Sequence, residues 1–226
     1  MTAAPALRPK ALETRARILE AALDLFRERG YEAATMRAIA ERAGVSLGNA
    51  YYYFRSKEHL IQAFYGRTHD EHRTIVDARL DEHKDLKARL RWTMRTKLET
   101  VEPYHRFAGL LFRSAADPLS PLNPFSAESQ PVRREATALL ARVVEGARGR
   151  VPADLRAALP NLLWLYEMGI ILFWIHDPSP GRRRTRQLME RSVDLVVKLI
   201  GLASLPFMGP VRRAALRLVA ELSEAA

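Results

Sequence analysis

The stretch from residue 46 to residue 54 carries side chains that could hydrogen-bond to a surface. Ser46, Gly48, Asn49 and Tyr52 can face outward from a short helix, where they present hydroxyl, amide and aromatic groups and no Glu–Lys pairs. An Asn amide can pair bidentately with adenine, and small residues let a backbone approach a partner closely. The composition of this face therefore indicates contact with a partner rather than with water.

Residues suited to catalysis or metal binding are sparse. The chain has six His and no Cys, so it can form no disulfide, thiolate metal site or cysteine nucleophile. It shows no nucleophile elbow, glycine-rich phosphate loop or metalloprotease motif, which argues against an enzyme. The nearest approach to a metal site is His69-Asp-Glu-His72, with two imidazoles on one helix face. Because a site needs a third ligand, chance surface placement is favoured, and we expect no metal and no cofactor.

Length, composition and charge fit a globular protein with a polyanionic partner. Of 226 residues, 48% are hydrophobic and 27% are charged, which excludes disordered and fibrous classes. The net charge of +10 favours a partner such as nucleic acid, because Lys and Arg neutralise phosphates. However, residues 1–66 hold ten Lys or Arg against seven Asp or Glu, so the excess is not confined to the N-terminal part. Charge alone therefore does not locate a binding surface.

Hydrophobic spacing predicts one long helix followed by shorter ones in the N-terminal part. Each is bounded by a capping Ser or Thr or by a Gly that ends it. The predicted spans are about Leu12–Arg29, Thr35–Gly44, Ser46–Phe54 and a helix that opens at Ser56. Residues 1–11 contain Pro5 and Pro9 and no apolar run, so we expect a mobile arm and neither a signal peptide nor a membrane anchor.

Beyond Gly66 the sequence predicts long helices and no strand. The expected spans are Asp85–Val101, Pro103–Ala116, Ser126–Ala147, Ala153–His176, Gly181–Ala203 and Pro210–Leu222. Proline-rich segments at 117–125 and 177–181 are expected to be loops, because Pro lacks the backbone donor that a helix needs. We therefore expect an all-α protein with two unequal domains, at 1–66 and 67–226.

Residues 35–54 have the order of a helix-turn-helix. That motif needs a support helix, a tight turn that usually contains Gly, and a second helix whose exposed face can enter the major groove. The small or apolar packing positions are Ile39, Ala40, Ala43, Val45, Ala50 and Phe54. The same spacing leaves the polar face of residues 46–52 turned outward.

Three consecutive segments carry a family resemblance. They are Phe26-Arg-Glu-Arg-Gly-Tyr31 at the end of the opening helix, Ala34-Thr-Met-Arg-Ala-Ile-Ala-Glu-Arg-Ala-Gly-Val-Ser46, and Gly48-Asn-Ala-Tyr-Tyr-Tyr-Phe-Arg-Ser-Lys-Glu-His-Leu60. In order and spacing, the stretch Thr14–Leu60 resembles the TetR/AcrR family of repressors. The match covers about a fifth of the chain. It implies an N-terminal three-helix DNA-binding domain and a larger C-terminal helical domain for ligand binding and dimerisation.

The resemblance also implies DNA-binding roles for individual residues. Thr35 would hydrogen-bond a phosphate, and Arg37 would reach a phosphate or a base edge. The positions that would read bases or approach the groove floor are Ser46, Gly48, Asn49 and Tyr52. The positions that would clamp the DNA backbone are Tyr51, Tyr53 and Lys57.

Simpler interpretations stay open for several of these residues. Thr35 could only cap its helix, and Tyr51 could be partly core. Position 49 is Asn where the family often has Thr, and position 52 is Tyr where His or Trp is common, so the base preference can differ. Four further basic residues could follow the DNA backbone or minor groove, or could form an ordinary solvated end: Arg8, Lys10, Arg15 and Arg17.

By the same resemblance, two late helices from each subunit would form a four-helix dimer interface. The run 162–175 is apolar nearly all round and needs burial against more than one neighbour; it is too short, and interrupted by Glu167, for a bilayer span. The second helix would be the one around residues 188–199. The expected interface residues are Leu165, Gly169, Leu172, Leu188, Ser192, Leu195, Val196 and Leu199.

The resemblance places a ligand cavity among the helices of the larger domain. The candidate lining residues are Trp92, Arg95, Phe107, Leu111, Phe112, Trp164, Glu167, Met168 and Phe173. Any of the aromatic residues could equally be plain core. A buried Glu167 is costly unless it is paired, so it could meet a cationic ligand, but Arg95 is the favoured partner.

These expectations describe a bacterial, cytoplasmic, homodimeric transcriptional regulator. It would bind double-stranded DNA at a palindromic operator, act as a repressor, and be released by a small hydrophobic or amphipathic effector, without a membrane partner. The helix at about 56–72 would transmit the change. The alternatives are a ligand-independent DNA-binding dimer, an architectural protein, and an activator.

Overall fold

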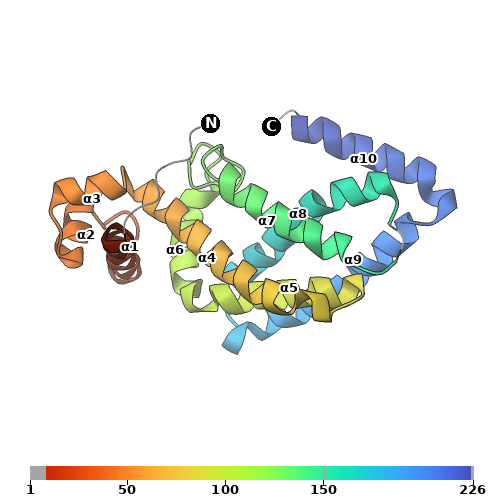
Figure 1. Ribbon diagram of the computed structural model, residues 1–226, viewed down its shortest axis with the longest axis horizontal. Coiled ribbons are helices and arrows are strands. Elements are labelled where there is room, and N and C mark those ends of the chain that lie inside the picture. The colour runs from red at the N-terminus through yellow and green to blue at the C-terminus, as the bar shows by residue number, and fades with distance from the viewer. Residues whose placement is uncertain (1–8, 150, 225–226) are drawn as a thin grey trace. The chain divides into compact units, whose positions relative to one another are not determined.

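The computed structural model describes residues 9–149 and 151–224. Within these ranges the regular elements are helices, and no strand is present beyond an isolated bridge between Asp85 and Arg148. The prediction of an all-α fold is therefore confirmed. The α-helices are α1 (Pro9–Arg29), α2 (Met36–Ala43), α3 (Leu47–Tyr53), α4 (Lys57–Arg79), α5 (Leu86–Val101), α6 (His105–Ala116), α7 (Gln130–Glu145), α8 (Ala153–His176), α9 (Arg183–Ala203) and α10 (Gly209–Glu224) (Figure 1). Short 3-10 turns cover Leu80–Glu82, Glu102–Tyr104, Pro180–Arg182 and Pro206–Met208.

The helix starts of α1 and α7 differ from the predicted ones by more than two residues. Helix α1 begins at Pro9, so residues 9–11 of the expected arm are helical, whereas residues 1–8 lie outside the described residues. A Pro is well tolerated in the first helical turn, where its missing N–H is not needed. Helix α7 begins at Gln130 instead of Ser126; the Ser126 hydroxyl donates back to the Pro121 carbonyl of the loop at 3.0 Å and accepts from the Ser129 backbone N–H at 3.1 Å.

The described chain forms two compact units. Unit 1 contains the residues up to Thr68 together with Tyr104–Val132, and unit 2 contains His69–Pro103 together with the residues from Arg133 onward. The sequence placed a boundary after residue 66 and assigned everything beyond it to the larger domain. The structure differs in that α6 and the loop that follows it belong to unit 1.

Aromatic packing explains why α6 joins unit 1. Phe107 of α6 is buried, and its ring stacks on Phe26 of α1 at a centroid distance of 5.8 Å. It also meets Phe64 of α4 edge-on at 5.3 Å. Such aromatic pairs contribute about 0.5–1.5 kcal/mol beyond their buried area. The loop is fixed as well, because the Gln62 amide donates to the Pro121 carbonyl at 2.7 Å.

A buried arginine holds α5 in unit 2. The Arg89 guanidinium donates to four backbone carbonyls at 2.9–3.1 Å, those of Leu80, His83, Arg142 and Val143. It thereby joins the 3-10 turn after α4, the start of α5 and the end of α7. Because each carbonyl would lose its partner if the guanidinium moved, Arg89 acts as a structural crosslink.

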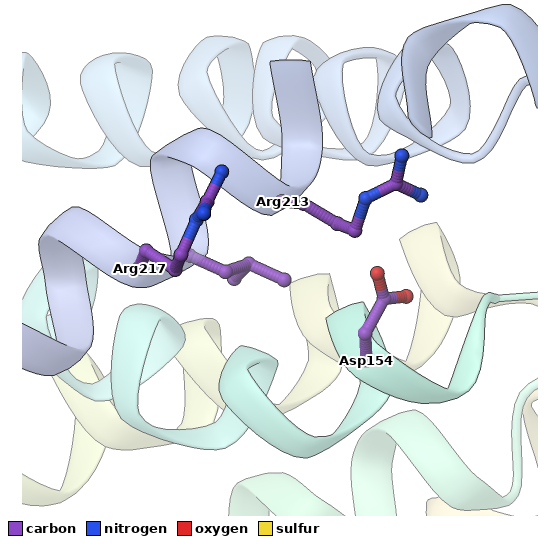
Figure 2. A pocket seen from close by; sticks show the side chains of 4 residues that line it. Asp154, Arg213 and Arg217 are labelled. Carbon is purple, nitrogen blue, oxygen red and sulfur yellow. The ribbon is translucent and has the colours of Figure 1, made fainter. Parts of the chain in front are cut away.

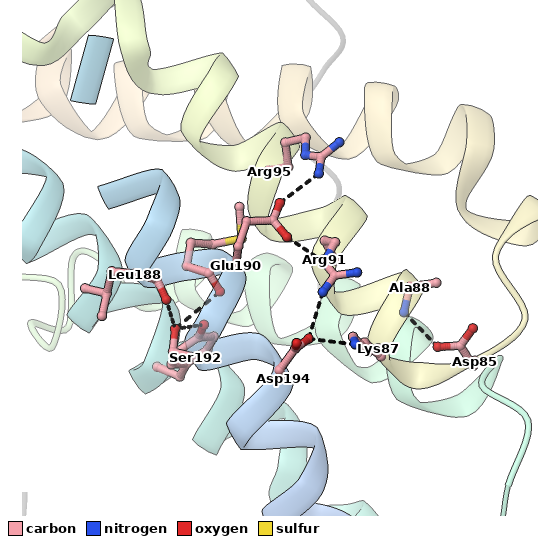
Figure 3. Close-up of polar contacts among 11 residues, drawn as sticks. Asp85, Lys87, Ala88, Arg91, Arg95, Leu188, Glu190, Ser192 and Asp194 are labelled. Carbon is pink, nitrogen blue, oxygen red and sulfur yellow. Dashed lines mark hydrogen bonds and ion pairs between the residues drawn. The ribbon is translucent and has the colours of Figure 1, made fainter. Parts of the chain in front are cut away.

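Ion pairs connect α5 to α9 on the surface of unit 2. Arg91 contacts Glu190 and Asp194, each at 2.7 Å, while Lys87 contacts Asp194 at 2.9 Å and Arg95 contacts Glu190 at 2.7 Å (Figure 3). All five side chains are partly exposed, so each pair adds at most about 1 kcal/mol. The main effect of these ion pairs is therefore to fix which face of α5 meets which face of α9. Their contribution to stability is small.

Helix α8 is the most apolar helix in the described residues. It has 24 residues, and its most apolar window has a mean hydropathy of 1.5, enough by length and composition to cross a membrane. The expectation that the segment is too short for a bilayer concerned only residues 162–175, and α8 begins before that run. Core helices of globular proteins have the same composition. In unit 2, α8 packs on α9 and α10 and carries the buried Glu167, which is paired with Lys97.

Candidate nucleic-acid interface

Helix α2 and the turn after it are built as a rigid support. Thr35 caps α2, and its hydroxyl accepts from the Ala38 backbone N–H at 3.2 Å. The inner face of the helix buries Ile39 and Ala40. Gly44 ends α2 in the left-handed conformation, at φ +64°, which side-chain-bearing residues rarely adopt. This single residue lets α3 start at once in a new direction.

Helix α3 buries one side and presents the other. Ser46 caps it and accepts from the Asn49 backbone N–H at 3.2 Å, while Ala50 is completely buried. On the outer side Gly48 and Asn49 are exposed, Tyr51 is 47% exposed and Tyr52 is 75% exposed. The predicted division of α3 into an inner and an outer face is confirmed.

Neighbouring side chains restrain the outer face. The rings of Tyr52 and Tyr53 meet edge-on at a centroid distance of 5.1 Å. Because two aromatic rings in contact lose little further freedom when a partner binds, they form a pre-organised platform. Arg37 is exposed on α2, whereas the Arg15 guanidinium lies over the Phe54 ring at 4.8 Å. Arg15 is half-buried, and its possible contact with the DNA backbone stays a prediction; Lys10 and Arg17 are exposed, and Arg8 lies outside the described residues.

Lys57 has a structural partner that the sequence did not reveal. Its Nζ donates to the Tyr31 carbonyl at 2.7 Å and to the Glu32 carbonyl at 3.3 Å, and it lies 4.4 Å above the Tyr31 ring centroid. The Tyr31 hydroxyl in turn donates to Glu58 Oε1 at 2.6 Å. The ammonium group thus closes the α1–α2 turn onto the start of α4. Its predicted role as a phosphate clamp stays a prediction.

The carboxylate in this arrangement is held in its ionised form. Burial opposes ionisation of Glu58, but hydrogen bonds from Ser56 and Tyr31 outweigh it and lower the pKa of Glu58. For Tyr31, burial together with the bond to Glu58 raises the pKa above its usual range. Glu58 therefore stays an acceptor and Tyr31 a donor across the physiological pH range.

Comparison with known proteins fits this geometry. Residues 18–64 match the family described as bacterial regulatory proteins, tetR family, and residues 89–218 match the tetracyclin repressor-like C-terminal domain, which covers more than half of the chain. The chain belongs to the TetR family of transcriptional regulators. Relatives of this TetR-family chain include the transcriptional repressor KstR of Mycolicibacterium smegmatis, 46% identical over 69 residues. That match spans 30% of this chain and 32% of KstR, so it is confined to one part of each protein.

Solved structures support the same fold over most of the chain. A TetR regulator from Nitrosomonas europaea matches with a TM-score of 0.61 and 21% identity, covering 81% of this chain and 97% of that one. Thermus thermophilus FadR, a TetR-family repressor solved in complex with lauroyl-CoA, matches with a TM-score of 0.60 and 24% identity, covering 81% and 93%. At these identities the likeness establishes the fold only.

The residues predicted to line a ligand cavity are divided between the two units of this TetR-family protein. Phe107 and Leu111 are buried in the core of unit 1, whereas Trp164 and Glu167 are buried in unit 2. Arg95 and Phe173 are exposed, and Trp92, Phe112 and Met168 are half-buried. The plain-core interpretation fits Phe107 and Leu111, since both pack in the hydrophobic cluster of unit 1.

The expected partner of Glu167 was wrong. Glu167 is 2% exposed and its Oε1 lies 3.0 Å from Lys97 Nζ, while Arg95 pairs with Glu190. Residues two apart on a helix point about 200° away from each other. With Lys97 turned inward from α5, Arg95 necessarily faces out.

The two histidines of the His69-Asp-Glu-His72 stretch are buried in unit 2, so their expected surface placement was wrong. His69 is 3% exposed and His72 is 1% exposed, and their ring centroids lie 6.5 Å apart. His72 Nε2 lies 3.0 Å from the Thr93 carbonyl oxygen of α5. Within the described part of the chain no group of three or more possible ligands is placed to hold a metal ion.

The predicted interface residues lie on exposed or half-exposed parts of α8 and α9. The exposed ones are Leu165, Gly169, Leu172, Leu188, Leu195 and Leu199, and the half-buried ones are Ser192 and Val196. The Ser192 hydroxyl donates to the Leu188 carbonyl (Figure 3). It also lies 2.7 Å from the Tyr166 hydroxyl. The sequence analysis missed further exposed apolar side chains at the end of α9 and beyond it, at Leu202, Leu205, Phe207 and Val211.

An open hollow of about 440 Å³ lies between the start of α8 and α10. Its lining comprises Asp154, Arg213, Leu216 and Arg217, and Figure 2 shows Arg213 on the side of Asp154, with the Arg217 guanidinium turned away from that carboxylate. Asp154 is occupied, because Arg212 Nε donates to its Oδ2 at 2.9 Å. Nothing in the sequence pattern distinguished this hollow.

Proposed function

We propose that this TetR-family regulator is a repressor that binds a palindromic operator as a homodimer and is released by a small hydrophobic or amphipathic effector. The observation that carries the DNA-binding part is the outer face of α3. Asn49 and Tyr52 project there from a helix whose other side is locked by Ala50, and whose start is fixed by the Ser46 cap. Such a face can present donors and acceptors to base edges without rearranging.

The homodimer is supported by the exposed apolar face of α8 and α9. Exposed leucines recur there at helical spacing, with Leu195 56% exposed. A contiguous apolar patch on a folded protein marks an interaction site. A palindromic operator requires two α3 helices about one helical turn apart on DNA, roughly 34 Å, and a two-fold dimer supplies the two copies.

The effector part is supported by the size and chemistry of unit 2. Unit 2 is large enough to have a core of its own, and it buries His69, His72 and Glu167, which are polar groups of the kind that orient a ligand in an apolar pocket. Thermus thermophilus FadR, of the same fold, was solved with lauroyl-CoA. We propose that effector binding shifts the population toward a form with lower operator affinity, through a coupling of about 1–3 kcal/mol, and that the protein acts in the cytoplasm.

Selection from a random duplex library tests the DNA-binding part. We expect an inverted repeat to be enriched, bound with two subunits per site and with an affinity that falls steeply with salt. Enrichment of a single asymmetric half-site at one subunit per duplex would contradict it. A release assay on the selected duplex, with hydrophobic compounds, organic cations and acyl esters, then tests the effector part, and retention of the complex with every class would favour the ligand-independent alternative.

A further inference from the structure

Four ionisable side chains form a buried group inside unit 2, which we call the histidine cluster. It consists of His69 and His72 from α4, Lys97 from α5 and Glu167 from α8. Both rings and the carboxylate are at most 3% exposed, and the Lys97 side chain is 13% exposed. Lys97 Nζ and Glu167 Oε1 form an ion pair at 3.0 Å.

The cluster contains more hydrogen-bonding groups than the described residues satisfy. His72 Nε2 faces the Thr93 carbonyl, which can only accept, so Nε2 carries the hydrogen and Nδ1 of a neutral ring is an acceptor. That Nδ1 atom and both ring nitrogens of His69 have no hydrogen-bond partner among the described residues. An unpaired buried polar atom is costly in any fold. The cluster thus offers two acceptors and one donor to a guest.

The cluster carries little net charge. Lys97 and Glu167 cancel each other. Burial and the neighbouring Lys97 lower the pKa of His72 to about 4, and the same two causes lower the pKa of His69, although Glu167, Asp70 and Glu135 act in the opposite direction on His69. Both imidazoles are therefore neutral at pH 7. A neutral guest would enter without an unbalanced charge, whereas an ion would not.

The helices that supply the cluster otherwise bury apolar side chains. Val76 of α4, Leu90 and Met94 of α5, and Leu163 and Ile170 of α8 are all buried in unit 2. A guest that reaches the histidines therefore needs a mainly apolar body. A hydrogen-bonding group at one end would then provide orientation and specificity.

We propose that the histidine cluster binds the polar end of the effector, and that this end is a neutral hydroxyl or carboxamide on an apolar molecule. The group donates its hydrogen to His72 Nδ1 and shares a second hydrogen bond with His69. This inference rests on the proposed function, since it names the chemical class of the effector. A metal ion is not the guest, because within the described residues no third ligand converges with the two imidazoles.

Thermal unfolding with four probes that share one alkyl chain tests the proposal. The probes are 1-octanol, octanamide, octanoate and octylammonium, each added at the same concentrations to the full chain at pH 7.5. We expect octanol and octanamide to raise the Tm by about 3–6 °C at ten times their Kd. The two ions are expected to bind at least tenfold more weakly.

Variants of the histidine cluster distinguish specific binding of octanol at the histidines from non-specific hydrophobic binding elsewhere in the protein. His69→Leu and His72→Leu are expected to fold, because each replaces an incompletely paired buried ring by an apolar side chain, and to lose the octanol response. Thr96→Val is the matched control: its hydroxyl is also buried on α5 but already donates to the Trp92 carbonyl, so the response is retained. Should a Leu variant not fold, ¹⁵N spectra of labelled histidine in the wild type give the same answer, since octanol should shift His72 Nδ1 and leave Nε2 protonated.

Three results would overturn the proposal: equal stabilisation by octanoate or octylammonium, an unchanged octanol response in both Leu variants, or no response of the wild type to either neutral probe. Binding of the wild type and the Leu variants to the selected operator duplex is measured in a separate assay. Release from the selected duplex by octanoate alone would sink the proposal and leave the proposed function standing. Failure to bind any selected duplex would instead remove the proposed function, whatever octanol does.

Discussion

At the scale of single residues, the proposed function assigns two kinds of DNA contact to α3 and its neighbours. Phosphate contacts position a protein on the duplex, whereas base contacts give specificity. Asn49 and Tyr52 are the most suitable base readers, because both are exposed and both carry hydrogen-bonding groups. Thr35 also caps α2, so its cap is established while its predicted phosphate contact remains open.

Replacing the proposed base readers, Asn49 and Tyr52, should relax specificity. We expect Asn49→Ala and Tyr52→Ala to weaken binding to the selected operator by about 1–3 kcal/mol each, with little change on unrelated duplexes. Fluorescence anisotropy titrations of the selected operator and of an unrelated duplex give the two Kd values, and their ratio measures specificity. A loss of the same size on every sequence would show that these side chains contact phosphates instead.

Lys57 should matter to both folding and DNA binding. Because its ammonium group joins the Tyr31 and Glu32 carbonyls to α4, Lys57→Ala should lower the free energy of unfolding by about 1–3 kcal/mol. If it also reaches a phosphate, the salt slope of binding should fall by about one. Arg55→Ala removes an exposed cation two residues away and should change stability by less than about 0.5 kcal/mol, as measured by urea unfolding. Equal stabilities of the two variants would contradict the crosslink.

The lowered pKa of His72 makes the free energy of unfolding depend on pH. Its pKa is about 4 in the folded protein and about 6.5 when unfolded, so the unfolded chain binds the extra proton first as the pH falls. The neutral ring therefore contributes stability that is complete above pH 6.5 and is lost between pH 6.5 and 4. Between pH 7.5 and 5.0 this group should cost about 2 kcal/mol. Urea unfolding of His72→Leu should show a loss smaller by that amount, whereas Thr96→Val should keep the wild-type loss.

At the scale of elements, the helices begin and end where local chemistry dictates. Thr35, Ser46 and Asp85 each cap a helix by accepting a backbone N–H three residues further on. Such caps contribute about 1 kcal/mol each. Where α5 and α7 are joined, by contrast, a long-range device takes over, namely the Arg89 guanidinium and its four carbonyls.

A methyl group at Gly146 should disturb that crosslink. A Cβ there would lie 2.3 Å from an Nη atom of Arg89, and the guanidinium cannot move aside without breaking its hydrogen bonds. We expect Gly146→Ala to destabilise the protein by about 1–3 kcal/mol. Gly109→Ala on α6 is the control, because its Cβ would meet nothing, and it should be neutral or stabilising by up to about 1 kcal/mol. Thermal unfolding measures the stability of both variants. Equal changes in stability for Gly146→Ala and Gly109→Ala would contradict the predicted clash with Arg89.

At the scale of the whole molecule, the proposed function depends on pairing two chains. The exposed leucines of α8 and α9 carry the predicted interface, so Leu195→Glu should place a charge in an apolar contact. We expect a monomer by light scattering and at least a tenfold loss of operator affinity, since a single α3 helix holds only half a site. Leu119→Glu, at an exposed leucine of the loop after α6, should leave both unchanged. A dimeric Leu195→Glu protein would place the interface elsewhere.

The local part of this architecture follows from the sequence alone. Helix starts at Thr35 and Ser46, the stop at Gly44 and the outward position of Tyr52 depend on interactions within about four residues, so periodicity and capping rules suffice to predict them. The same holds for the family, because its motif lies in one uninterrupted stretch.

The tertiary structure alone decided which distant side chains meet. It paired Glu167 with Lys97 instead of Arg95, buried His69 and His72, and assigned α6 to unit 1. Each outcome depends on which face of a helix is turned inward by a partner more than twenty residues away, and helical periodicity is compatible with several such rotations. Contacts between residues so far apart in the sequence depend on the packing of the whole unit, because each helix has a single rotation about its axis that must fit all of its neighbours.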